Sequence, residues 1–143
     1  KYEPRDSQQT IANAMDVGDP SNFARIYDLF GGSHEQISAL MSGATYNDAQ
    51  IRHTMKACHD TTGYILDPHG ACGYQALKDL LQPDEHGVFG ETAHPAKFKN
   101  VVEDAIGTEV QIPERLAAFM KGTKQSVEMS KDFDSFKKFL MEQ

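Results

Sequence analysis

The feature that most constrains the fold is an alternation of short apolar runs and helical stripes between residues 63 and 107. Residues 63–66 (GYIL) and 87–91 (GVFGE) have the length and the glycine-bounded apolar character of buried strands. Each run is followed by apolar residues at helical spacing, from His69 to Leu81 and from Pro95 to Ile106. The connection between the two runs is too long for a hairpin, so the sequence predicts a parallel βαβ unit with a right-handed crossover.

Three helices are expected before this unit. Apolar stripes and capping residues predict them from Phe23 to about Phe30, from Glu35 to about Met41, and from a cap at Asn47 or Asp48 through Cys58. We expect the apolar stripe of each of these helices to pack in a core.

Two more helices are expected in the last third of the chain. One covers residues 114–120 after Pro113, and the other, capped by Ser130 or Asp132, carries an apolar face made of Phe133, Phe136 and Leu140. The predicted fold class is α/β: a helical segment at 8–62, a βαβα core at 63–107, and C-terminal helices at 108–143. Because two strands make a poor sheet, we expect the chain to contribute to a larger sheet or to self-associate.

Composition limits the classes of partner and site. The 143 residues carry 14 basic against 21 acidic side chains, a net charge of −7, which argues against a nucleic-acid surface. No apolar run approaches the ~20 residues of a membrane helix, and the two cysteines fit a reducing cytoplasm. The pairs Cys58-His59 and His69-x-x-Cys72 lack the paired blocks of a structural zinc site, so we expect no metal.

Two polar clusters follow the predicted strands, residues 67–70 (DPHG) and 91–95 (ETAHP). Ligands of open α/β sheets bind beyond the carboxyl ends of strands, and neighbouring strands lie ~5 Å apart. Asp67 and Glu91 are candidates for a carboxylate pair in acid–base chemistry, although spacing does not set their distance. Spacing alone favours a simpler interpretation, in which Asp67 and Thr92 are helix N-caps that each stabilise the fold by about 1 kcal/mol.

Three segments of the sequence resemble one enzyme family. AMDVGDPSNFARI from residue 14, DPHGACGYQAL from residue 67 and ETAHPAKF from residue 91 are similar to threonine synthase, in the longer form typical of many bacteria and fungi. The resemblance covers most of the chain from Gln8 onward. It implies the large domain of a fold-type-II, tryptophan-synthase-β-like enzyme. The activity it implies is that of a carbon–oxygen lyase of threonine biosynthesis in the cytoplasm, which converts O-phospho-L-homoserine and water to L-threonine and phosphate with pyridoxal 5'-phosphate.

The resemblance also implies roles for individual residues. Thr92 corresponds to the partner of the cofactor's pyridine nitrogen, and its neutral hydroxyl suits an unprotonated ring nitrogen. Asp67 and His69 are placed beside the ring, by position only. Residues 14–17 and Asn22 are placed near the mouth of the active site.

No catalytic residue is expected in this chain, because the resemblance assigns the Schiff-base lysine and the phosphate-binding loop to the N-terminal portion of the enzyme. Lys97 lies in the HPAKF segment, which is not the Schiff-base motif. The chain thus looks like the C-terminal third of the enzyme, with the N-terminal portion of the same polypeptide as its partner. Alone it is expected to be inactive. The alternative is a non-catalytic binding or interaction domain derived from a pyridoxal-phosphate lyase.

Overall fold

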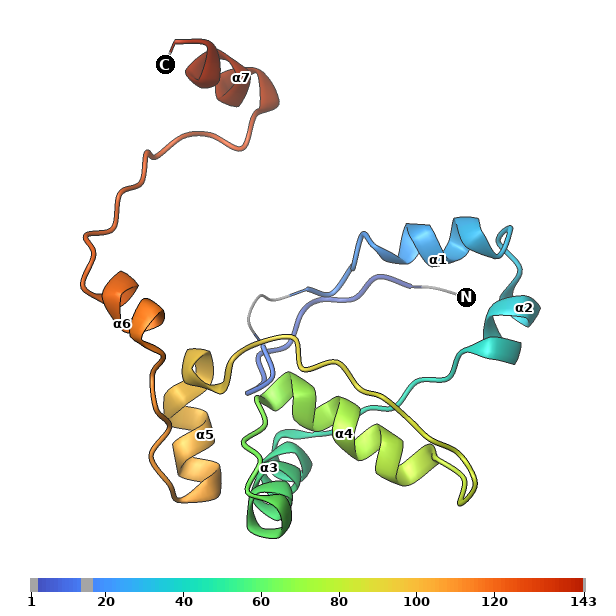
Figure 1. Ribbon diagram of the computed structural model, residues 1–143. Helices are drawn as coiled ribbons and strands as arrows, with labels where there is room; N and C mark the ends of the chain where they lie inside the picture. Colours follow the sequence, from blue (N-terminus) through green and yellow to red (C-terminus); the bar gives the residue numbers. More distant parts are fainter. Residues whose placement is uncertain (1–2, 14–16, 143) are drawn as a thin grey trace. The chain divides into compact units, whose positions relative to one another are not determined.

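The computed structural model describes residues 3–13 and 17–142, and its regular structure is helical (Figure 1). The elements in chain order are α1 (Phe23–Leu29), α2 (His34–Leu40), α3 (Asp48–Thr62), α4 (Pro68–Leu80), the 3-10 helix η1 (Pro95–Phe98), α5 (Lys99–Ile106), α6 (Glu114–Met120) and α7 (Phe133–Met141). The chain divides into two compact units, one up to Gln111 and one from Ile112 onward, and each is described by itself.

The ends of α3 follow from local sequence. Asn47 caps its N-terminus in a reciprocal capping box: its side chain accepts from the Gln50 backbone N–H at 3.0 Å, and the Gln50 side chain accepts from the Asn47 N–H at 2.9 Å. Gly63 ends the helix with φ of 74°, a left-handed conformation that glycine adopts at little cost. Because both signals lie within a few residues of the helix ends, sequence alone predicts that α3 begins at Asn47 or Asp48.

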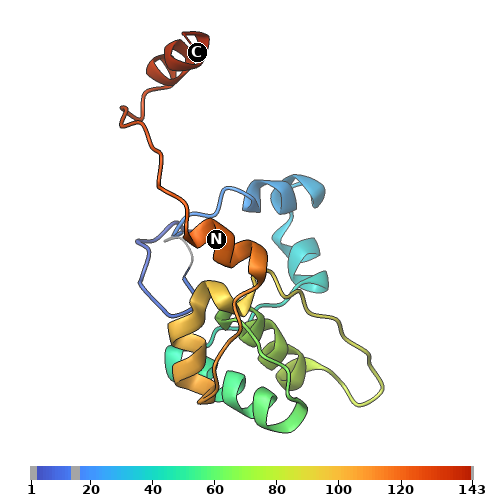
Figure 2. The ribbon, with the colours of Figure 1, turned by 60° about the vertical axis from the view of Figure 1, so that its left-hand side comes forward.

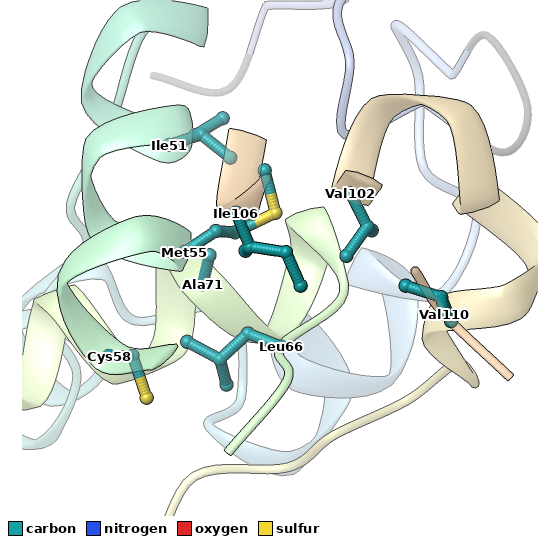
Figure 3. Close-up of a cluster of buried hydrophobic side chains, with 8 residues drawn as sticks. All are labelled: Ile51, Met55, Cys58, Leu66, Ala71, Val102, Ile106 and Val110. Atoms are coloured by element: carbon teal, nitrogen blue, oxygen red, sulfur yellow. The ribbon is translucent and has the colours of Figure 1, made fainter. Parts of the chain in front are cut away.

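The core of the first unit forms where α3 packs against α4 and α5 (Figure 3). Its buried apolar side chains are Ile51, Met55, Cys58, Leu66, Ala71, Val102, Ile106 and Val110. The predicted stripe of α3 is therefore confirmed as core. The stripes of α1 and α2 are not, because neither helix contributes a buried side chain, and a helix of two turns has little apolar face to bury.

The predicted strand at residues 63–66 is wrong. No strand occurs in the part of the chain that the structure describes, and these residues instead join two helices. Gly63 serves as the C-cap of α3 and Asp67 as the N-cap of α4, so only three residues remain between the caps. Of these, Leu66 is fully buried in the core and Tyr64 is half exposed. The apolar character that predicted a strand therefore reflects core packing.

The second predicted strand, residues 87–91, lies along α4 rather than beside another strand. Figures 1 and 2 show the chain leaving the end of α4 in a wide loop and returning towards η1. Alternate residues meet the helix: Gly87 at Leu77, and Phe89 at Tyr74, with ring centroids 5.7 Å apart. Every second residue of this segment does face a packing surface, as in a strand, but that surface belongs to a helix. Without a neighbouring backbone ladder, the predicted βαβ unit is absent from the described residues.

The other predicted helices are present in their expected places. The helix expected from Pro95 begins as η1, continues as α5 and ends at Gly107, which has φ of 71°. In the second unit α6 and α7 match the predicted segments, and Asp132 caps α7 by accepting from the Ser135 N–H at 2.8 Å. Within residues 3–13 and 17–142, no helix has the length and apolarity needed to cross a membrane.

Replacement of Met55 by alanine should destabilise the first unit more than replacement of an exposed methionine. Met55 is fully buried between the helices, so Met55→Ala removes packed atoms and leaves a cavity, at a cost of about 2–5 kcal/mol. Met41→Ala is the matched control, because Met41 is 45% exposed. Urea unfolding of both variants checks this prediction, and an equal loss in the two would contradict the assignment of the core.

Candidate functional site

The N-terminus of α4 is organised by Asp67, whose side chain is fully buried. Its carboxylate accepts from the backbone N–H of His69 at 2.8 Å and, more weakly, from that of Gly70 at 3.4 Å. Pro68 occupies the first helical position, where its missing N–H would have been unpaired in any case. Asp67 is therefore the N-cap that the spacing favoured, and it also takes part in a larger group of contacts.

Glu91 reaches Asp67 from the other predicted cluster. The Asp67 backbone N–H donates to Glu91 Oε1 at 2.7 Å, across 24 residues of sequence. The second oxygen, Glu91 Oε2, is buried and has no hydrogen-bond donor among the described residues. The two clusters predicted to meet are thus brought together, but by a carboxylate on a backbone N–H rather than by adjacent strands.

Gly70 provides the space that the Glu91 carboxylate occupies. A Cβ atom built on Gly70 would lie 2.0 Å from Glu91 Oε2 and 2.8 Å from Oε1, far inside any normal contact. The first turn of α4 therefore has a cradle that only glycine leaves open. Sequence reasoning missed this role, because the need for glycine at position 70 arises from atoms of a distant segment.

His69 completes the group on the side of Asp67. Its Nδ1 lies 2.7 Å from Asp67 Oδ1, and its ring packs at a tilt against Phe98, with centroids 5.1 Å apart. The His69 side chain is 30% exposed. This arrangement orients the imidazole and links the start of α4 to η1.

The pKa values of the two carboxyl groups shift in opposite directions. Burial, followed by the hydrogen bond and negative charge of the Asp67 side chain, raises the pKa of Glu91 to about 7, although the bond from the Asp67 N–H opposes the shift. Burial would also raise the pKa of Asp67, but hydrogen bonds from Glu91 and His69 lower it below its usual range. Asp67 is therefore the ionised member of the pair, and Glu91 retains a proton up to about neutral pH.

Thr92 is exposed and lies at the edge of an open hollow of about 730 Å³. Its lining comes from residues 63–65, 91–95, 97 and 110–111 and includes the polar side chains of Tyr64, Glu91, His94 and Lys97. Thr92 is not a helix cap: His94 caps η1, its Nδ1 accepting from the Ala96 N–H at 3.1 Å. The capping interpretation of Thr92 is thus wrong, and its hydroxyl has no hydrogen-bond partner among the described residues.

The remaining residues singled out in the sequence have other surroundings. Asp67 lies next to Glu91 and His69 next to Asp67, but neither is among the residues that line the hollow, so their place beside a cofactor stays a prediction. Cys58 lies in the core, and the Cys72 thiol donates to the Pro68 carbonyl at 3.5 Å. In the described ranges no three His, Cys, Asp or Glu side chains are grouped to hold a metal. Residues 14–16 of the predicted mouth loop lie outside the described residues.

Comparison with known proteins finds similarity to one family. Residues 70–140 match the family described as "Threonine synthase, C-terminal". Threonine synthase from Haemophilus influenzae is 39% identical over 140 residues, which are 98% of this chain and 32% of that protein. Threonine synthase from Escherichia coli is 37% identical over 141 residues, 99% of this chain and 32% of that protein.

Solved structures give the same result. The crystal structure of Escherichia coli threonine synthase superposes with a TM-score of 0.82 at 35% identity, over 99% of this chain and 33% of that one. A pyridoxal-phosphate-bound threonine synthase from Brucella melitensis superposes with a TM-score of 0.70 at 24% identity, over 99% of this chain and 36% of that one, which shows the fold alone. The chain spans about a third of the length of the relatives it matches.

Gly70→Ala should destabilise the chain, the reverse of the usual effect inside a helix, where alanine is favoured by roughly 0.5–1 kcal/mol. The new methyl group and the Glu91 carboxylate cannot share the same space, so we expect a loss of about 1–3 kcal/mol in urea unfolding. Gly73→Ala, one turn later in α4, is the matched control with a nearest contact of 3.3 Å to Phe89 Cβ, and should lose less. A Gly70→Ala chain as stable as the wild type would disprove the cradle.

The free energy of unfolding should fall as pH rises from about 4.5 to about 7. In this range native Glu91 holds a proton that an unfolded glutamate, with its ordinary pKa of 4.5, has lost, so rising pH favours the unfolded state. Glu91→Gln should remove this part of the slope, because the amide keeps an acceptor for the Asp67 N–H and carries no titrating proton. Urea titrations across this pH range test it, with Glu85→Gln on the exposed loop as a control that should keep the wild-type slope. The same slope in both variants would contradict the pKa shift.

Proposed function

We propose that this chain, which is similar in sequence and fold to the C-terminal part of threonine synthase, forms one side of a pyridoxal-phosphate site in a longer enzyme. The activity we propose for that enzyme is the conversion of O-phospho-L-homoserine and water to L-threonine and phosphate, a carbon–oxygen lyase reaction. The rest of the enzyme, N-terminal to this region in the relatives, would supply the Schiff-base lysine. The chain alone would then be inactive.

The observation that carries the proposal is the state of Thr92. Thr92 is exposed, lines the hollow and directly follows a residue anchored at the start of α4. Its hydroxyl has no hydrogen-bond partner among the described residues. A hydroxyl that neither caps a helix nor bonds to the protein is available to a ligand. Thr92 therefore fits a group with a hydrogen-bond acceptor, such as the nitrogen of a pyridine ring.

The residues present fit the cofactor in a definite way. Bound pyridoxal phosphate would supply an electron sink for the bond changes at the substrate. Thr92 would hold the ring by donating a hydrogen bond to its nitrogen without transferring a proton. Residues 92–93 form a short bridge between Glu91 and His94. Each of these two side chains is fixed by a hydrogen bond that it accepts, Glu91 from the Asp67 N–H and His94 from the Ala96 N–H.

Asp67 and His69 would act indirectly, through the residues that they hold in place. Asp67 is fully buried and holds the first turn of α4, and His69 is bonded to it. In the proposed site they support Glu91 and the segment that carries Thr92. The division of the chain into segments 8–62, 63–107 and 108–143 is proposed on the same ground, with the middle segment providing the cofactor contacts.

Thr92→Val should weaken pyridoxal-phosphate binding in the full-length protein that carries this chain. Valine has nearly the shape of threonine but lacks its hydroxyl. The expected loss is therefore that of a single hydrogen bond, about 1 kcal/mol or roughly fivefold in affinity, with a shift in cofactor absorption. Thr123→Val, at an exposed threonine in the loop between α6 and α7, is the matched control. Cofactor titration and phosphate release from O-phospho-L-homoserine provide the measurements.

Unchanged absorption and affinity in Thr92→Val would remove Thr92 from the cofactor site. A full-length protein that binds no pyridoxal phosphate and releases no phosphate would instead favour the non-catalytic interaction domain.

A further inference from the structure

The Glu91 carboxyl group occupies a place where an ion is unfavourable. One oxygen accepts from the Asp67 N–H at 2.7 Å, while the other is buried and meets no donor among the described residues. Its neighbour Asp67 is itself a carboxylate with no exposed surface. Two carboxylates close together, one of them fully buried, cannot both be ionised at low cost, so a single proton between them is the favourable arrangement.

The hydrogen bonds decide which group carries this proton. Asp67 Oδ1 already receives the His69 N–H at 2.8 Å and faces His69 Nδ1 at 2.7 Å, contacts that stabilise an ionised carboxylate. Glu91 has one such bond and one oxygen without a donor. A proton on Glu91 turns that oxygen into a donor, and Asp67 is the acceptor beside it.

Thr92 depends on this contact for its position. The preceding loop is exposed from residue 81 to residue 88, and the next anchor is His94 at the start of η1. Only Ala93 separates Thr92 from that anchor. Phe89 also packs on α4, against Tyr74. The Glu91 side chain, held at the cradle of Gly70, is the last contact with α4 before Thr92 and therefore the one that sets its position most directly.

We propose that Glu91 carries a proton and, as a neutral acid hydrogen-bonded to the Asp67 carboxylate, positions the Thr92 hydroxyl for a pyridine-type ring. Glu91 is then a positioning residue that acts through Thr92. This inference rests on the proposed function, because it concerns the same hollow. Loss of the proton would set two negative charges against each other at the start of α4 and release the segment that carries Thr92.

Other titratable groups face the pair from both sides. They are His69 and Cys72 from α4, and His94 and Lys97 from the segment that lines the hollow with Glu91. Burial and the charge of Asp67 raise the pKa of the Cys72 thiol, which therefore adds no negative charge near neutral pH. Neither His94, which caps η1 through Nδ1, nor the exposed Lys97 bonds Asp67 in the described part of the chain. From this side the donor to the Asp67 carboxylate is therefore Glu91.

The first test follows the proton in the 143-residue chain itself. Carbon-13 NMR of the glutamate side-chain carboxyl groups, assigned by comparison with Glu91→Gln, should show Glu91 titrating with a pKa of about 7. Glu85, on the exposed loop, is the internal reference. Titration of Glu91 near the ordinary glutamate value of 4.5 would overturn the inference, whatever the enzyme's activity.

The second test measures pyridoxal-phosphate affinity in the full-length protein. If the protonated form is the competent one, a group with a pKa near 7 makes the apparent Kd rise roughly tenfold between about pH 6 and 8. Glu91→Gln mimics the protonated acid, so its affinity relative to the wild type should rise by that factor over the same range. Glu91→Ala should bind weakly at both pH values, and Glu85→Gln should follow the wild type.

The outcomes separate the two proposals. If pyridoxal phosphate binds in a Thr92-dependent way but Glu91→Gln shows the pH dependence of the wild type, the role of Glu91 is wrong and the proposed function stands. If the full-length protein binds no pyridoxal phosphate, the proposed function fails, and with it the role of Glu91 towards the ring. The NMR titration then still decides whether the proton resides on Glu91.

Discussion

The contact between Asp67 and Glu91 is the interaction on which this part of the molecule depends. Asp67 ends the connection from α3 and caps α4, so it sets where the second core helix begins. Glu91 binds the same residue from a segment 24 positions later and brings the chain back to the start of α4. This one pair of residues therefore sets where α4 begins, closes the loop that follows α4 and places the lining of the hollow. The net free energy of one such hydrogen bond is small, but removal of either partner leaves a buried polar group without a partner.

The return of the chain along α4 shows how a helix can replace a neighbouring strand. In an extended segment every second residue faces the same way, and Gly87, Phe89 and Glu91 meet successive turns of α4 at Leu77, Gly73 and Gly70. Glycine leaves room at two of these contacts: on the helix Gly70 makes space for the anchored Glu91 carboxylate, and on the segment Gly87 lies close to the methyl groups of Leu77. In both places a side chain of the facing segment comes close to a glycine Cα.

The helices could be predicted from sequence because their signals are local. The Asn47 capping box, Asp67 before Pro68 and the Gly107 stop each lie within a few residues of the end they define. The strands could not be predicted reliably, because a ladder requires a partner backbone that an apolar run of four or five residues does not reveal. The cap of η1 was predictable in principle: Pro95 at its first position makes His94 the preceding cap, which leaves Thr92 free.

In the proposed site the two neighbouring side chains that line the hollow, the Thr92 hydroxyl and the protonated Glu91 carboxyl group, are both uncharged. A threonine hydroxyl can bond a pyridine nitrogen without protonating it, whereas an ionised carboxylate nearby would favour the protonated ring. Glu91 precedes Thr92, lines the same hollow and would be such a carboxylate if it were ionised. Burial in the Gly70 cradle and the charge of Asp67 keep its proton in place up to about pH 7. The proton on Glu91 therefore has two effects in the proposed site: it holds Thr92 in position, and it keeps a second negative charge from the lining of the hollow.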